Sequence, residues 1–197
     1  MTTAYPRPTI LHTVIPRNWV TTVTLIIGFA LLTVVAAQVR IPIPGTPVPI
    51  TGQTFAVLLA GAAIGAHAGA ASQALYWTIG AVGFPVYAQN QGGWEAATGA
   101  TGGYLIGFIA AAWLVGYLAE RGQDRNVWSA VPAFLSGNAV IYLFGVPWLM
   151  WSVESFTTIG DALAAGFTPF VVGDVVKVVA AGLLLPAAWK LVDAIRR

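Results

Sequence analysis

The sequence contains no cysteine and little charge, and each scarcity excludes a class of protein. Without cysteine, the 197-residue chain can form neither a disulfide framework nor a thiolate site for a metal or for redox chemistry. Its two histidines, His12 and His67, are too few and too far apart in sequence to form a metal cluster. Charged residues make up 8% of the chain, against ~25% in soluble domains, whereas 57% of the residues are hydrophobic. This composition predicts an integral membrane protein without a metal site.

Nucleic acid binding and nucleotide hydrolysis are excluded by similar arguments. The net charge of +2 is small, and the basic residues gather near the ends of apolar segments, so nucleic acid is not an expected partner. The chain also lacks the Gly-x-x-x-x-Gly-Lys-Ser/Thr string that binds nucleotide phosphates. Any ATP-driven step must therefore be carried out by another chain.

Long apolar runs make up most of the sequence. A bilayer core is crossed by roughly 20 helical residues, and four runs have this length. A fifth run, residues 53–84, would give a helix of about 48 Å, which is too long for one crossing. The small residues of the string GAHAG, at 65–69, are the expected place for a turn. We therefore predict an all-α membrane protein, a single domain over residues 1–197 with a compact bundle of six transmembrane helices at about 19–39, 53–66, 69–84, 101–120, 127–148 and 167–190.

Basic residues near the ends of these spans predict the orientation. Because lysine and arginine of short loops collect on the cytoplasmic side, both termini are expected in the cytoplasm, with residues 1–18 as a cytoplasmic tail. Five spans would divide the basic residues less unevenly, but the length of the 53–84 run favours six. A cleaved signal peptide is not expected, since the first apolar run is longer than the usual core of about 7–15 residues. With six spans, the inner face carries Arg7, Arg17, Arg121, Arg125, Lys190, Arg196 and Arg197, and the outer face carries Arg40.

The connection after the first span, residues 40–53, reads RIPIPGTPVPITGQ. Its four prolines remove amide donors and disfavour helix in the residues before them. A non-helical, proline-rich outer loop is therefore expected between helices 1 and 2. Because irregular apolar backbone near lipid persists only where protein or a cavity satisfies it, we predict that this loop folds over the bundle as a lid. The alternative is an inert loop that rests on the lipid head groups.

The second outer connection, residues 84–103, combines glycines with polar and aromatic side chains. It carries the amides Gln89, Asn90 and Gln91 beside Tyr87. Glycines let a backbone approach a ligand closely, and amides offer both donors and acceptors. Because long loops tend to carry binding function, a ligand is expected to enter from the outer side.

Asp174 and Lys177 lie inside the last apolar span, where ionisable groups are rare. Each costs about 2.5–3.5 kcal/mol near the centre of a bilayer, so a compensating interaction is expected. Three positions apart, they share one face of a helix and can neutralise each other, take part in a proton or cation path, or form the polar end of a small-molecule site. We favour the small-molecule site, because a relay normally needs several acidic groups. A stand-alone proton- or ion-coupled carrier or channel, and an intramembrane enzyme using these two residues, are the alternatives.

Four motifs, in order along the chain, resemble the BioY family, the biotin-specific substrate-binding (S) component of energy-coupling factor (ECF) transporters. They read VRIPIPGTPVPITGQTFAVLLAGAAIG, GFPVY, TGGYLIGF and FVVGDVVK, and the close resemblance covers residues 30–110 and 168–180. It implies a prokaryotic cell-membrane protein with six helices and both termini in the cytoplasm, which binds biotin at its outer face without a cofactor. It also implies three partners, a membrane scaffold subunit and two cytoplasmic ATPase subunits, so that the chain itself is not an enzyme.

The same resemblance implies the residues that contact biotin. The ureido ring of biotin presents two N–H donors and a carbonyl, and its side chain ends in a carboxylate. Asp174 is expected to accept from the ureido N–H groups, and Lys177 to pair with a ureido or carboxylate oxygen. Thr51 and Gln53 would close above the ligand. The further candidates are Asn90, Gly103, Tyr104, Tyr87 and Trp77.

The chain departs from the family pattern at two places. The string GATGG at 99–103 has Ala100 where the family usually has proline, which loosens that turn. The first helix of the family commonly bears Ala-x-x-x-Ala for docking on the scaffold subunit, and here the corresponding pair is Ala30 and Val34. Docking is therefore expected to use Gly28, Thr33 and Ala37 instead.

Overall fold

Helices account for most of residues 7–195, the part of the chain that the computed structural model describes. Apolar side chains recur on all faces of the long helices, as expected for segments that contact either other helices or lipid. Each of the six predicted spans coincides with one long helix, although whether each helix crosses the membrane stays a prediction. The long helices are α2 (Trp19–Gln38), α3 (Gln53–Ile64), α4 (Ala66–Ala81), α6 (Gly102–Ala119), α7 (Val127–Ser152) and α9 (Val171–Ile195).

Shorter elements connect these helices. The two ends of the segment 40–51 pair as antiparallel strands, Arg40 with Thr51 and Ile41 with Ile50. The proline-containing residues between the strands are not helical. The remaining elements are α1 (Ile10–Val14), β1 (Arg40–Ile41), β2 (Ile50–Thr51), α5 (Trp94–Thr98), α8 (Ile159–Gly166) and the 3-10 turns η1 (Ala88–Asn90) and η2 (Thr168–Phe170).

Four segments of the described chain are long and apolar enough to cross a membrane. They are α2, α6, α7 and the stretch Ile159–Ala194, which includes α9. Helices α3 and α4 have 12 and 16 residues, shorter than the roughly 20 that an untilted crossing requires. The structure is thus that of an all-α membrane protein.

Helices α3 and α4 are separated by a single residue, Gly65, with φ of 90°. Only glycine adopts this conformation readily, and it reverses the chain without a longer loop. The turn therefore lies at the start of the GAHAG string, and α4 begins at Ala66, three residues before the predicted position. A side-chain oxygen of Glu120, at the end of α6, accepts a hydrogen bond of 3.0 Å from the Ala66 amide and so caps α4.

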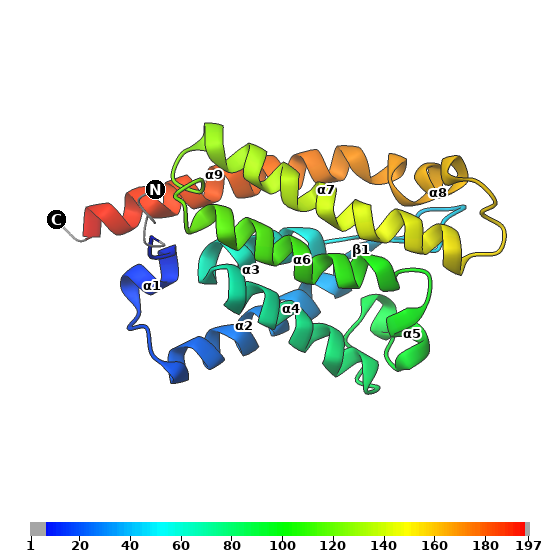
Figure 1. Cartoon of the computed structure of the whole chain (residues 1–197), viewed down its shortest axis with the longest axis horizontal. Coiled ribbons are helices and arrows are strands. Elements are labelled where there is room, and N and C mark those ends of the chain that lie inside the picture. Colours follow the sequence, from blue (N-terminus) through cyan, green and yellow to red (C-terminus); the bar gives the residue numbers. More distant parts are fainter. Residues whose placement is uncertain (1–6, 196–197) are drawn as a thin grey trace, which may run out of the picture.

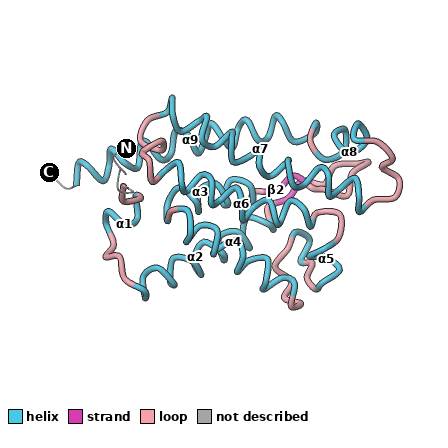
Figure 2. Tube along the Cα trace, in the orientation of Figure 1, coloured by secondary structure: helices cyan, strands magenta, loops and turns pink. Residues whose placement is uncertain are grey.

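The two ends of the bundle contain different elements. At the end that we call the loop end lie the β1–β2 hairpin, α5 and α8 (Figures 1 and 2). At the opposite end, the terminal end, lie α1 and the last turns of α9 (Figure 1). The short connection between α6 and α7 is also at the terminal end, since the Arg7 amide donates to the Glu120 carbonyl at 2.8 Å.

Helix α6 occupies the centre of the bundle, in contact with α3, α4 and α7. Gly61 on α3 allows this packing, because a side chain there would collide with the backbone of Ala112 on α6. Toward the terminal end, Leu58, Val115 and Phe134 form one buried cluster that joins α3, α6 and α7. The packing leaves space between α3, α6, α7 and α9 toward the loop end, where the first cavity described below lies.

The predicted docking residues on α2 need correction. Thr33 and Ala37 are fully buried, and the Thr33 hydroxyl lies 3.2 Å from the side-chain oxygen of Gln73 on α4. Thr33 therefore takes part in the α2–α4 contact, and neither buried side chain is exposed for contact with another subunit in this structure. Gly28 is exposed, with no atom near the position that a Cβ would occupy.

Candidate functional site

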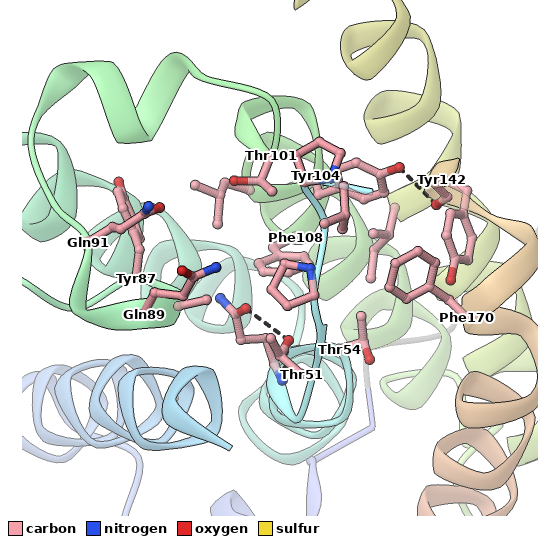
Figure 3. Close-up of a pocket in the computed structure, with 18 of the residues that line it drawn as sticks. Thr51, Thr54, Tyr87, Gln89, Gln91, Thr101, Tyr104, Phe108, Tyr142 and Phe170 are labelled. Carbon is pink, nitrogen blue, oxygen red and sulfur yellow. Dashed lines mark hydrogen bonds between the residues drawn. The ribbon is translucent and has the colours of Figure 1, made fainter. Parts of the chain in front are cut away.

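A cavity of about 120 Å³ opens among the helices at the loop end. This is roughly ten times the space that one water molecule needs, so the cavity has room for a small organic ligand. The proline loop contributes Pro47, Val48 and Pro49, and most of the remaining lining comes from the 87–91 loop and from α3, α6, α7 and α9, with single residues from β2, α5, α8 and η2. Figure 3 shows Tyr104, Tyr142 and Phe170 on one side of it and Tyr87, Gln89 and Gln91 on the other.

Asp174 and Lys177 form the charged part of the lining. The Lys177 ammonium lies 3.1 Å from one carboxylate oxygen of Asp174, and their side chains are 18% and 7% exposed, respectively. The second Asp174 oxygen accepts from the Tyr142 hydroxyl, and the ammonium also donates to the Thr54 hydroxyl at 3.0 Å. Helices α3, α7 and α9 therefore meet in one polar cluster.

This cluster retains hydrogen-bonding capacity. A carboxylate has about four acceptor positions and an ammonium group three donors. Within residues 7–195, Asp174 accepts two hydrogen bonds and Lys177 donates two. About two acceptor positions and one N–H donor remain available beside the cavity. The pair is thus neither turned toward lipid nor satisfied solely by itself.

Apolar side chains form the wall next to the charged pair. Phe108 from α6, Ile141 from α7 and Phe170 from η2 line the cavity. Tyr104 presents its ring, because its hydroxyl donates to the Gly166 carbonyl at 2.8 Å. A mostly apolar cavity with a few convergent polar groups is the ordinary form of a small-molecule site.

Gln53 lines the cavity but uses both ends of its amide within the protein. Its oxygen accepts from the Thr51 hydroxyl at 2.9 Å, and its nitrogen donates to the Tyr76 hydroxyl at 2.7 Å. The Tyr76 hydroxyl in turn lies 3.3 Å from the Val86 carbonyl. This chain of hydrogen bonds joins the end of the proline loop to α4 and to the second loop.

Opposite the charged pair, the second loop contributes Tyr87, Gln89 and Gln91. Gln89 and Asn90 have φ of 66° and 55°, a conformation that is uncommon for residues other than glycine. The backbone reversal directs the flanking amides to the cavity, whereas Asn90 is exposed and does not line it. The prediction therefore chose the wrong member of the amide string as a lining residue.

Two further predicted contacts lie outside the cavity. Gly103 is buried against Trp148 of α7, so its lack of a side chain serves helix packing. The ring of Trp77 packs edge-on against the ring of Trp94, with centroids 6.1 Å apart. The backbone carbonyl of Trp77 accepts a hydrogen bond of 2.5 Å from the Tyr87 hydroxyl. Of the predicted residues, the structure brings together Asp174, Lys177, Tyr104, Thr51, Gln53 and Tyr87.

Sequence reasoning did not identify Tyr142 and Thr54, which bind the charged pair directly. A signal for Tyr142 was present, since a tyrosine hydroxyl inside a span needs a partner and Asp174 was the only acidic residue predicted there. Thr54 lies next to Gln53 in the first turn of α3, but its distance to Lys177 depends on the packing of α3 against α9. No pattern within either helix predicts that packing.

Comparison with known proteins identifies the family. The model of the BioY family matches residues 7–194. The chain is 39% identical over 163 residues to the biotin transporter BioY of Thermotoga maritima, which covers 83% of this chain and 92% of that protein. It is also 39% identical over 171 residues to the biotin transporter BioY of Rhodobacter capsulatus, covering 82% and 90% of the two chains.

The fold also matches a solved structure. The crystal structure of the S-component for biotin from an ECF-type ABC transporter superposes with a TM-score of 0.78 and 24% sequence identity, over 87% of this chain and 92% of that one. The motifs, the family model and the relatives therefore agree that the chain belongs to the BioY family.

Proposed function

We propose that this chain is the biotin-binding subunit of a vitamin uptake transporter and takes biotin from the outer face into the cavity at the loop end. The observation that carries the proposal is the Asp174–Lys177 pair, which lines an otherwise largely apolar cavity with hydrogen-bonding capacity to spare. The names of the relatives, all biotin transporters, support the choice of ligand. No cofactor or metal is part of the proposal.

The chemistry of biotin fits the distribution of polar groups. Its ureido N–H groups can donate to the acceptor positions that Asp174 retains, and the remaining Lys177 donor can meet a ureido or carboxylate oxygen. The thioether ring then packs against Phe108 and Phe170, where apolar contact stabilises it without directional bonds. Tyr104 contributes its ring to the same wall.

The proline loop acts as a lid over the bound ligand in this proposal. Its residues 47–49 already line the cavity, and Thr51 is held by Gln53 at the end of the loop. Gln53 then serves mainly to position the lid, because its own amide is occupied by Thr51 and Tyr76. The polar side chains of the second loop complete the opposite side.

The proposed topology places six spans in the cell membrane of a prokaryote, with both termini and the tail of residues 1–18 in the cytoplasm. In this proposal the six long helices are those spans and belong to a single domain, for which residues 1–197 are the predicted bounds. The distribution of charge supports this orientation: Arg40 belongs to the hairpin at the loop end, whereas Arg7, Arg121 and Arg125 lie at the terminal end.

Inward delivery of biotin is proposed to use an ATP-driven coupling module. This module comprises a membrane scaffold subunit and two cytoplasmic ATPase subunits, and the biotin-binding chain supplies no enzymatic step. The solved S-component from an ECF-type transporter has the same fold, which is compatible with such an assembly. The exposed face of α2 around Gly28 is available for the scaffold contact.

The proposal is tested by measuring biotin binding to the purified protein by calorimetry. The expected result is one biotin per chain, with most of the affinity lost in Asp174→Asn and retained in the control Asp193→Asn. The control changes an exposed carboxylate farther along the same helix. Absence of binding by the wild type, or unchanged affinity in Asp174→Asn, would refute the proposal. Ion flux through liposomes in the absence of biotin would favour a stand-alone carrier or channel.

A further inference from the structure

A second cavity, of about 230 Å³, lies at the terminal end of the bundle. It is formed where the start of α2 and helix α1 approach the turn between α3 and α4 and the end of α6. Its lining consists of His12, Arg17, Thr22, Ile26, Ile64, His67, Ala68 and Glu120. None of these residues belongs to the cavity at the loop end, so this second site requires an explanation of its own.

Arg17 and Glu120 face this second cavity without forming an ion pair. Among residues 7–195, no nitrogen of Arg17 lies within 4.0 Å of a carboxylate oxygen, and its guanidinium makes no hydrogen bond. One oxygen of Glu120 accepts from the Ala66 amide, while the other has no hydrogen-bond partner in the described chain. Opposite charges that share a cavity without touching can be bridged by a ligand that carries both signs.

Two histidines, His12 and His67, also line this cavity. The Nδ1 atom of His12 is buried and has no hydrogen-bond partner within the described residues. Burial and the neighbouring Arg17 lower the pKa of His12, although Glu120 partly opposes them. Arg17 and Glu120 bring side chains of opposite charge to the cavity, which matches a zwitterion better than a simple anion.

The remaining lining connects the cavity to the lipid-facing surface of α2. Ile26 of α2 and Ile64 of α3 line the cavity. Val23 and Ile27, also on α2, are each 45% exposed. Acyl chains placed along these residues would continue from a head group held in the cavity. Trp19, 78% exposed at the start of α2, is the kind of residue that lies at the interface between membrane and water.

We propose that this second cavity binds the head group of a phospholipid that carries both a phosphate and a primary ammonium group. Arg17 and His67 contact the phosphate, and Glu120 accepts from the ammonium. Arg17 supplies a basic group of the kind by which pockets between membrane helices hold lipid head groups, and a lipid bound here would tie α1 and α2 to the α3–α4 turn. The proposal requires that the chain spans a membrane, but not that its ligand is biotin.

Native mass spectrometry of the intact protein in detergent tests the proposal. Phosphatidylethanolamine, phosphatidylcholine and phosphatidylglycerol with identical acyl chains are added at equal concentration. The adduct with phosphatidylethanolamine is expected to dominate. Phosphatidylcholine has no N–H group to donate a hydrogen bond, and phosphatidylglycerol has no ammonium group. Arg17→Gln and Glu120→Gln should each reduce that adduct about tenfold, as expected for loss of one charge-assisted hydrogen bond.

Matched controls separate the site from general effects of charge. Glutamine at position 120 keeps a side-chain oxygen for the Ala66 amide, so α4 retains its cap. Arg121→Gln and Glu95→Gln make the same changes at exposed positions outside the cavity and should leave the adduct unchanged. Thermal unfolding of the same samples reports folding, and absence of biotin binding by the wild type would count against the proposed function without bearing on the lipid.

Three outcomes would overturn the lipid proposal. The first is equal binding of the three lipids by the wild type. The second is an unchanged adduct in both Arg17→Gln and Glu120→Gln. The third is full displacement of the lipid by an equal concentration of soluble phosphoethanolamine, because the apolar part of the cavity would then contribute nothing.

Discussion

The two ends of the bundle each bury a carboxylate, and the two carboxylates have different surroundings. Asp174, at the loop end, is 5% exposed, accepts from Lys177 and Tyr142, and lines a cavity. Asp124, at the terminal end, is 2% exposed and accepts from the Trp189 indole at 2.7 Å. Its other oxygen is buried without a partner in residues 7–195, and it lines neither cavity.

This difference separates a carboxylate that lines a cavity from one that only joins elements of the fold. Asp124 joins the α6–α7 connection to α9, and the Arg125 guanidinium lies 4.1 Å from the centre of the Trp189 ring in the same contact. Asp174 instead has a cation beside it and open space in front of it. Burial alone therefore does not distinguish the two carboxylates, and it is the cation and the cavity beside Asp174 on which our proposal of a ligand site rests.

The largest effect in this comparison is expected for Lys177→Met. Methionine keeps much of the length of lysine but leaves Asp174 buried without its cation. The hydrogen bond that the ammonium would donate to the ligand contributes about 1.5–3 kcal/mol, so biotin affinity should fall roughly 10- to 100-fold or slightly more. Calorimetry measures the loss, and Lys190→Met, at an exposed position of the same helix, is the control. Binding within a few-fold of the wild type would show that the ammonium is dispensable.

An intermediate effect is expected for Gln53→Leu, which separates positioning of the lid from contact with the ligand. The variant removes the hydrogen bonds to Thr51 and Tyr76 while keeping a similar side-chain volume. The dissociation rate of biotin should rise about tenfold, with little change in the association rate. Stopped-flow fluorescence measures both rates, and Gln123→Leu, exposed at the terminal end, is the control. An unchanged dissociation rate would show that Gln53 does not position the lid.

Tyr142→Phe should have a smaller effect at the same cavity. It removes one hydrogen bond to Asp174, but the oxygen that becomes available can accept from the ligand instead. Affinity should therefore fall about fivefold, within the range for one hydrogen bond. Tyr117→Phe, on α6 at the opposite end, provides a matched control for equilibrium binding. A loss as large as that of Lys177→Met would mean that Tyr142 contacts the ligand directly.

Local patterns in the sequence predicted more of the fold than of the cavity. Run lengths located the long helices, and Gly65 lies in the string where the turn was expected. Asp174 and Lys177 stood out because charge is rare in apolar spans. Features that depend on how helices pack were missed: Thr33 is turned toward α4, and Thr54 meets Lys177 across 123 positions of the chain.

The loops show the same limit on a smaller scale. Three successive amides, Gln89, Asn90 and Gln91, were candidates, and the positive φ of two of them decides which side chains reach the cavity. Composition indicates that such a loop is polar but not which way each residue points. Gln53 was correctly placed at the cavity, although its hydrogen bonds to Thr51 and Tyr76 give it a positioning role in our proposal.

The smallest effect on biotin affinity is expected for Asp124→Asn. The same substitution made at Asp174 should remove most of that affinity. Asparagine retains an oxygen for the Trp189 indole, so the contact between the α6–α7 connection and α9 can persist. Burial raises the pKa of Asp124 above its ordinary value of 3.8, with Trp189 and Arg125 opposing the rise. The folded protein therefore binds this proton more tightly than the unfolded chain does.

This shift determines how stability depends on pH. Because the pKa of Asp124 is raised by folding, its protonation contributes to the free energy of unfolding. This contribution is fully present below the pKa of the unfolded chain, near 3.8, and is lost as the pH rises through the pKa of the folded protein. Thermal unfolding of the wild type should accordingly show a component that weakens over this window, and Asp124→Asn should lack it. At pH 7 the variant should be as stable as the wild type or slightly more so, with unchanged biotin affinity. If it unfolds much more easily there, the charge of Asp124 is needed, and the two buried carboxylates are more alike than their surroundings indicate.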